Sequence, residues 1–177
     1  MKFVRRSLCF WLAVAVALIG ARSAMAQASS AKSSPGTSVA PAALQREFFD
    51  AIRAGDVQKV LSYVGKGGVN VGSSAQHATQ DQVEQEFLAH RGLYCKLFDS
   101  SCIQAPINLD NSARTCSYRE LLRHSENVHT AASEITRNGV RQAVVVARMK
   151  NDGCPNQNLI DFVFNLEADG WKLFSIP

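Results

Sequence analysis

The sequence predicts an α+β protein whose helices precede an antiparallel sheet. In the N-terminal half, apolar residues recur every three or four positions, which is the spacing of amphipathic helices. From about Val128 the spacing changes to two, which is typical of half-buried strands. Two pairs of strand-like segments flank Asn138-Gly139 and Asp169-Gly170, which favour hairpin turns.

The first 26 residues have the three parts of a secretory signal peptide. Residues 1–7 are basic, residues 9–20 form an apolar run of 12, and Ala24-Met25-Ala26 is a small-residue cleavage site. A bilayer span takes about 20 apolar residues, so this run is too short, although an uncleaved anchor is the alternative. We therefore expect a periplasmic or secreted protein with no other contact with the membrane.

The predicted mature chain is neutral and has the size of one domain. The signal peptide holds four of the 19 basic residues and no acid, which leaves 15 basic and 15 acidic residues. This balance argues against a nucleic-acid partner. Residues 27–41 are rich in Ser, Ala, Pro and Gly and predict a disordered linker, and residues 42–177 predict a single domain.

Two helices are predicted first. Leu44, Phe48 and Ile52 form an apolar stripe over residues 43–53, Gly55 ends that helix, and Asp56 can cap the next. Residues 53–71 look like part of an ankyrin repeat, but no second copy follows and the C-terminal half is β, which excludes a solenoid. The apolar positions of the second helix are Val57, Val60, Leu61 and Val64.

The middle of the chain predicts a short strand at residues 69–71 and two further helices. Thr79 with Gln82, and Ser117 with Glu120, have the spacing of capping boxes at helix starts. The first of these helices is expected to carry four residues on one face, namely Val83, Phe87, His90 and Tyr94.

The last two strands predict a buried and an outer face. With Asp169-Gly170 as a two-residue turn, Ala168 lies opposite Trp171, and Glu167 lies opposite Lys172 as a cross-strand ion pair. Alternation then places Ile160, Phe162, Phe164, Leu166, Trp171 and Leu173 on the core face. It places Leu159, Asp161, Val163, Asn165, Phe174 and Ile176 on the other face.

This order of elements, with the opening FFDAIRAGDVQKVLSYV and the closing LEADGWKLFSIP, resembles the nuclear-transport-factor-two-like superfamily, also called ketosteroid-isomerase-like or SnoaL-like. The resemblance covers about residues 44–177. It implies a cone-like, cystatin-like roll in which a curved sheet wraps around helices, often paired sheet to sheet. Enzymes of this superfamily use an Asp general base and hydrogen-bond donors in the cavity of the cone.

The candidate ligand-binding residues are Phe87, His90 and Tyr94, because in the family their helix helps to wall the cavity. They could bind a small apolar or amphipathic ligand, or His90 and Tyr94 could act as acid and base; the alternative is a boundary histidine beside a core tyrosine. Asp161 is expected outside the core, which argues against isomerase chemistry. No metal or cofactor motif is present. His124 and His129 lack the spacing of metal ligands, and His77, just before the third predicted helix, is expected only to cap that helix or to lie in a loop.

Four cysteines follow the signal peptide, an even number that favours disulfides in an exported chain. Of three possible pairings we expect Cys95–Cys102, a short local loop, and Cys116–Cys154, which closes a long one. Free structural cysteines are the alternative.

Two classes of function follow. The preferred interpretation is an exported, non-catalytic binding or assembly module that forms a homodimer through its sheet, because no acid–base pair converges. The dimer is expected on the outer face, where Val163, Phe174 and Ile176 gather. The alternative is a cavity enzyme, such as an isomerase, lyase or hydrolase, or a small-ligand binder that uses His90 and Tyr94.

Overall fold

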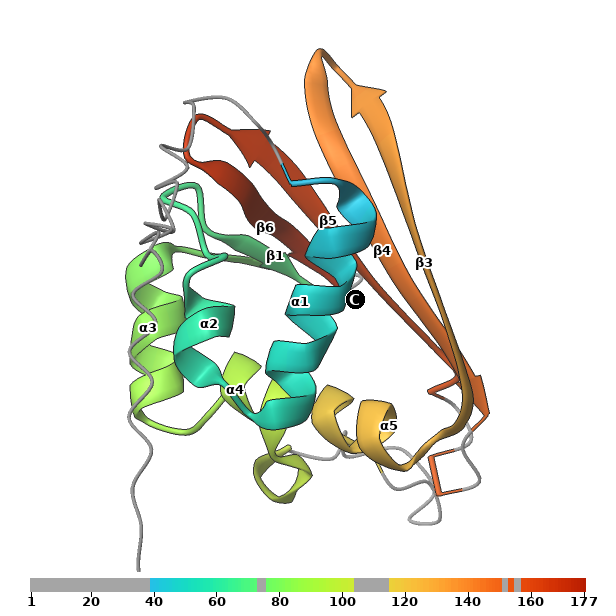
Figure 1. The fold of residues 1–177 in the computed structure, drawn as a ribbon. Helices are drawn as coiled ribbons and strands as arrows, with labels where there is room; N and C mark the ends of the chain where they lie inside the picture. Colours follow the sequence, from blue (N-terminus) through green and yellow to red (C-terminus); the bar gives the residue numbers. More distant parts are fainter. Residues whose placement is uncertain (1–38, 73–75, 104–114, 151–152, 155–156) are drawn as a thin grey trace, which may run out of the picture. The chain divides into compact units, whose positions relative to one another are not determined.

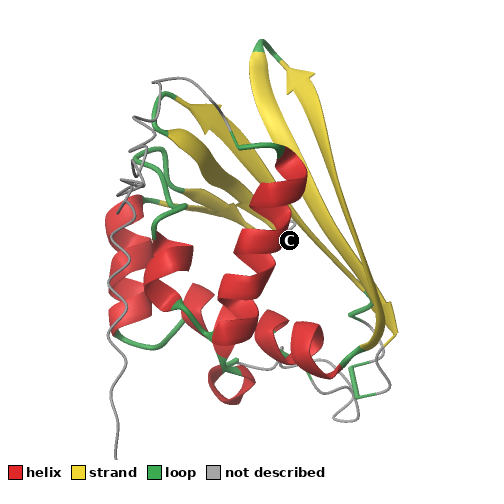
Figure 2. Cartoon of the chain, viewed as in Figure 1, coloured by secondary structure: helices red, strands yellow, loops and turns green. Residues whose placement is uncertain are grey.

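The computed structural model describes residues 39–72, 76–103, 115–150, 153–154 and 157–177. The predicted signal peptide and residues 27–38 of the predicted linker lie outside the described residues. The described part is an α+β domain, as predicted, in which helices pack on one side of a six-stranded sheet (Figures 1 and 2). No helix in this part is both long and apolar enough to cross a membrane.

The helices are α1 (Pro41–Ala54), α2 (Val57–Leu61), α3 (Gln80–Leu88), α4 (Leu93–Phe98), the 3-10 helix η1 (Ser100–Cys102) and α5 (Tyr118–His124). The strands are β1 (Val69–Val71), β2 (Gln76–Ala78), β3 (Glu126–Arg137), β4 (Val140–Lys150), β5 (Leu159–Glu167) and β6 (Gly170–Ile176). They lie in the order β2-β1-β6-β5-β4-β3, and all neighbours are antiparallel except β1 and β6, which are parallel. The sheet is therefore mixed rather than purely antiparallel.

The predicted helix starts are confirmed. Gly55 ends α1 with a φ of 78°, and the carboxylate of Asp56 accepts a hydrogen bond from the N–H of Lys59, 2.9 Å away, at the start of α2. Both predicted capping boxes, at Thr79 and at Ser117, are formed. Because α1 begins at Pro41, the domain starts slightly before the predicted boundary at residue 42.

The predicted extent of the third helix is wrong. α3 ends at Leu88, His90 lies in the following turn with a φ of 48°, and Tyr94 belongs to α4. Gly92 also has a positive φ, of 55°, so the chain leaves the helical conformation twice within three residues. His90 and Tyr94 therefore do not share a helix face with Val83.

The hairpin between β3 and β4 is confirmed. Arg137 pairs with Val140, and the two residues between them, Asn138 and Gly139, have φ values of 51° and 77°. Two positive φ angles are the requirement of a type I′ turn, whose twist matches that of the strands it joins.

The hairpin between β5 and β6 turns one residue earlier than predicted. Glu167 pairs with Gly170, so the two-residue turn is Ala168-Asp169, and Lys172 does not lie opposite Glu167. Gly170 has a φ of 116°, a conformation that L side chains rarely adopt, and it occupies the first position of the returning strand. The ammonium of Lys172 forms its ion pair with Asp169, at 3.0 Å.

The predicted outer face is wrong at Ile176, because β6 contains a β-bulge. The pairing of β6 with β5 passes from Leu173 to Ser175 and skips Phe174. One extra residue reverses the alternation of side chains. Phe174 is 39% exposed on the outer face, whereas Ile176, which we predicted beside it, is fully buried. The predicted core face is confirmed; all its members are buried except Leu166, which is half-buried.

Candidate functional site

Of the three predicted ligand-binding residues, Tyr94 contacts both Phe87 and His90. Phe87 is a core residue, 3% exposed, and its ring centroid lies 6.0 Å from that of Tyr94. His90 is exposed and stacks flat on Tyr94, with centroids 4.3 Å apart and an interplanar angle of 8°.

Aromatic rings fill the space between α1 and the sheet. The ring of Phe48 lies edge-on to those of Phe162, Phe164 and Tyr63, at centroid distances of 4.9, 5.0 and 5.4 Å. Tyr118 also lies edge-on to Phe162, at 5.5 Å. Such edge-to-face packing is favourable and makes these rings part of the hydrophobic core.

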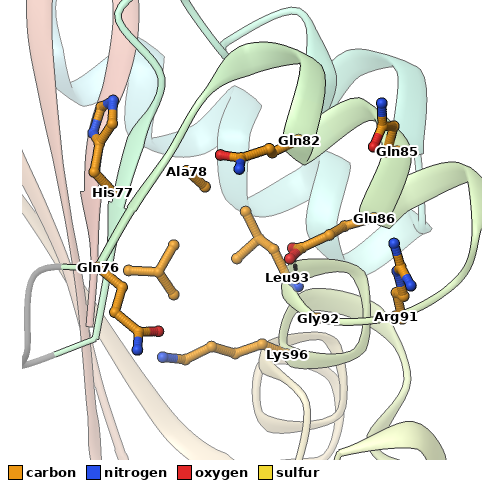
Figure 3. A pocket seen from close by; sticks show the side chains of 11 residues that line it. Gln76, His77, Ala78, Gln82, Gln85, Glu86, Arg91, Gly92, Leu93 and Lys96 are labelled. Atoms are coloured by element: carbon orange, nitrogen blue, oxygen red, sulfur yellow. Dashed lines mark hydrogen bonds between the residues drawn. The ribbon is translucent and has the colours of Figure 1, made fainter.

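A separate pocket lies between β2, α3 and α4, with a volume of about 680 Å³ (Figure 3). Val71, Ala78 and Leu93 form its apolar part. None of the three predicted ligand-binding residues lines it. Its polar side chains include Gln76, His77, Gln82, Glu86, Arg91 and Lys96.

Glu86 and Gly92 shape the wall of this pocket. The Glu86 carboxylate accepts a hydrogen bond from the N–H of Leu93, 2.7 Å away, at the start of α4. A Cβ atom at Gly92 would lie 2.4–2.6 Å from the carboxyl atoms of Glu86, so any other residue there would displace this carboxylate, and its backbone would be strained by the positive φ. The contact joins the end of α3 to the start of α4, and no local sequence pattern predicts it.

Lys96 projects into the pocket beside Gln76 (Figure 3). Its ammonium donates to the main-chain carbonyl of Pro177 and lies 5.9 Å from the centroid of the Tyr118 ring. Burial lowers the pKa of Lys96 below its ordinary value. With the amides and the carboxylate of the same wall, the pocket offers hydrogen-bond donors and acceptors to a polar molecule.

The outer face of the sheet, turned away from the helices, is the second candidate site. Asp161 lies on this face, half-buried, as predicted. Exposed apolar side chains gather here, although large apolar residues are usually covered. Of the six large apolar side chains exposed in the described residues, four lie on this face: Ile135, Val140, Leu159 and Phe174.

A shallow hollow opens between these side chains. Its volume is about 360 Å³, and Val140 and Phe174 form its apolar walls. Gln142 and Asn165 form its polar side, where the two amides are joined by a hydrogen bond of 2.9 Å. The hollow is thus shaped by β4, β5 and β6 together.

The remaining predicted residues fall outside both sites. Both predicted disulfides are present, Cys95–Cys102 with a Cα–Cα distance of 5.4 Å and Cys116–Cys154 with 6.2 Å. His124 and His129 are exposed. Among the described residues, no three His, Cys, Asp or Glu side chains lie close enough to hold a metal ion.

Comparison of the chain with models of protein families, with curated proteins and with solved structures found no match.

Proposed function

We propose that the chain is an exported, non-catalytic assembly module that pairs with a second copy through the outer face of its sheet. The observation that carries this proposal is the concentration of exposed apolar side chains on that face. Water is a poor environment for such a surface, and covering it with an identical surface removes both from solvent.

The composition of the outer face suits self-association. Val144, Val146 and Val163 lie half-buried on the same face and add apolar area on β4 and β5. Asp161 and Arg148 provide charges of both signs on the same face. A two-fold arrangement can therefore bring opposite charges together around an apolar centre.

We propose further that the domain is nuclear-transport-factor-two-like and that it functions outside the cytosol, and two features support this. Two short helices, a strand, a capped helix and long antiparallel strands follow one another in the order expected of a nuclear-transport-factor-two-like domain. The two disulfides are compatible with an oxidising compartment outside the cytosol.

The proposal is tested by sedimentation velocity over a micromolar concentration range, on mature protein with intact disulfides. The wild type is expected to self-associate, and Phe174→Ser to weaken the association through the outer face at least tenfold. Leu88→Ser is the matched control, because Leu88 is 85% exposed on α3, away from the sheet. A wild-type monomer throughout, or equal effects of the two substitutions, contradicts the proposal.

Small-ligand binding is the second candidate function, and the pocket beside α3 favours it. Its volume lies in the range of ligand sites, about 300–1,000 Å³. Its residues differ from those we predicted, since Glu86 and Lys96 replace His90 and Tyr94. A screen of small polar molecules by chemical-shift perturbation tests this function, with shifts expected at residues 76–78 and 86–96 and not on the outer face.

A further inference from the structure

β3 is a long edge strand with one open side. It pairs with β4 without interruption from His129 to Arg137, and no described residue pairs with its other side. It lies at the edge of the sheet, beside β4 alone (Figure 1). Nearly all its side chains are exposed, on both faces of the sheet. An open edge of this length is a template for another strand.

The turn that ends β3 identifies the main-chain groups on the open side. Arg137 and Val140 flank a two-residue turn, so they form a hydrogen-bonded pair. Successive residues of a strand direct their N–H and C=O groups to opposite sides. The even-numbered residues of β3 therefore direct theirs away from β4: Thr130, Ala132, Glu134 and Thr136.

Most of the usual sequence protection of an edge strand is missing in this stretch. Natural sheets guard their edges with charged side chains, above all lysine, with proline, with bulges, or with a helix or loop laid over the edge. Residues 129–136 contain no lysine or proline, and the irregular pairing of β3 lies before His129. Their one charged residue is Glu134, which forms an ion pair with Arg141 of β4 at 2.7 Å.

We propose that this edge binds β3 of a second copy, antiparallel, with the two-fold axis at Ala132 and with Thr130 opposite Glu134 of the other copy. An axis perpendicular to the sheet keeps the helices of both copies on the same side and makes even-numbered residues face one another. The two six-stranded sheets then form one continuous sheet.

The side chains around the axis favour an identical strand as the partner and favour this register. Ala131, Ala132 and Ser133 are small, so two identical strands can approach without a clash. Thr130 faces Glu134 on both sides of the axis, and no like charges meet. A register centred on Glu134 would place two carboxylates opposite each other, which is unfavourable.

This contact is independent of the outer face. It uses the main chain of β3 rather than the exposed apolar side chains, and either contact can exist without the other. A chain with both contacts associates through two surfaces and forms assemblies larger than a dimer.

Two cysteine substitutions test the contact and its register, because the four native cysteines of the domain are paired with each other. In the proposed register the two Ala132 Cα atoms lie about 5.5 Å apart, within disulfide range. The Cα atoms of the two Glu134 residues are about 14 Å apart. In a glutathione redox buffer, Ala132→Cys is expected to form a covalent dimer at least ten times faster than Glu134→Cys. No crosslink at position 132, or equal rates at both positions, overturns the proposal.

Ala132→Pro provides a second measurement. The substitution removes an N–H on the open side and leaves the bonds to β4 intact, which an edge strand tolerates. The measurement is made in Phe174→Ser protein, in which the contact through the outer face is already impaired. In that background Ala132→Pro is expected to weaken association through the β3 edge at least tenfold. The crosslink of Ala132→Cys is expected to persist in the same Phe174→Ser background. Its loss there would overturn the independent edge contact, whereas a failure of the proposed face dimer alone leaves the crosslink unchanged.

Discussion

The side-chain amide of Gln157 holds both main-chain groups of Cys116. Its Oε1 atom accepts the N–H of Cys116 at 2.7 Å, and its Nε2 atom donates to the carbonyl at 3.1 Å. Gln157 also donates its own N–H to the carbonyl of Cys154, 3.0 Å away. The Cys116–Cys154 disulfide thus lies in a hydrogen-bonded joint between the start of α5 and the connection that precedes β5.

Removing this disulfide is expected to destabilise the domain more than removing the other. The sequence separations are 38 and 7, for which loop entropy gives about 4 and about 2.5 kcal/mol. Thermal unfolding of the two double variants, Cys116→Ala/Cys154→Ala and Cys95→Ala/Cys102→Ala, measures the difference, expected as several degrees in Tm. A lower Tm for the second variant contradicts this ranking.

Ile176→Ala is expected to cost about 2–4 kcal/mol of the free energy of unfolding, because the bulge at Phe174 buries Ile176 completely. Phe174→Ala is expected to cost less than about 1 kcal/mol in the monomer, since Phe174 is partly exposed. Urea unfolding at low protein concentration compares the two variants. Similar losses for both residues would mean that the bulge is absent.

Gly92→Ala is expected to destabilise the domain by about 1–3 kcal/mol, because the new Cβ collides with the Glu86 carboxyl and the backbone has a positive φ. Gly67→Ala is the control, since a Cβ at Gly67 meets nothing within 4 Å. Thermal unfolding of both variants measures the difference. An unchanged Tm for Gly92→Ala would show that Glu86 does not hold this position.

The stability of the domain is expected to fall at alkaline pH because Tyr118 is buried. Burial, and then the charge of Asp161, raises the pKa of Tyr118 above its ordinary value, and its hydroxyl donates to the carbonyl of Pro177 at 3.0 Å. The neutral form is therefore favoured by folding. Its contribution to the free energy of unfolding is complete below about pH 10, the pKa of tyrosine in the unfolded chain, and is lost as the pH rises above that value.

Tyr118→Phe is accordingly expected to lose about 1 kcal/mol at neutral pH and to approach the wild type above pH 10. Urea unfolding at several pH values between 8 and 11 measures both proteins. Parallel pH profiles would indicate that Tyr118 titrates equally in the folded and unfolded states.

Export is expected to produce a mature protein that begins at Gln27. N-terminal sequencing of protein from the periplasm or medium measures the start. Ala24→Arg/Ala26→Arg is expected to block cleavage, since the peptidase reads small residues at these positions. Cytosolic wild-type protein with an intact Met1 would contradict the prediction.

The sequence by itself determined the features that depend on bonds between near neighbours. Asp56, Thr79 and Ser117 cap helices through atoms three residues away, and Asn138-Gly139 makes a turn from its own backbone preferences. The α+β class followed from the same local periodicities. The short disulfide joins residues of one segment, so its pairing could also be predicted.

The tertiary structure alone decided features that depend on distant segments. The bulge at Phe174 turns the side chain of Ile176 to the core face of the sheet, and no residue type in β6 predicts a bulge there. The pocket brings together Gln76 of β2, Glu86 of α3 and Lys96 of α4. The sequence around each of these residues contains no motif that indicates a binding site. His90 does not lie on the predicted helix face because α3 ends at Leu88 and His90 itself adopts a positive φ. Register, bulges and pockets follow from packing between segments that are remote in sequence, so local periodicity carries no information about them.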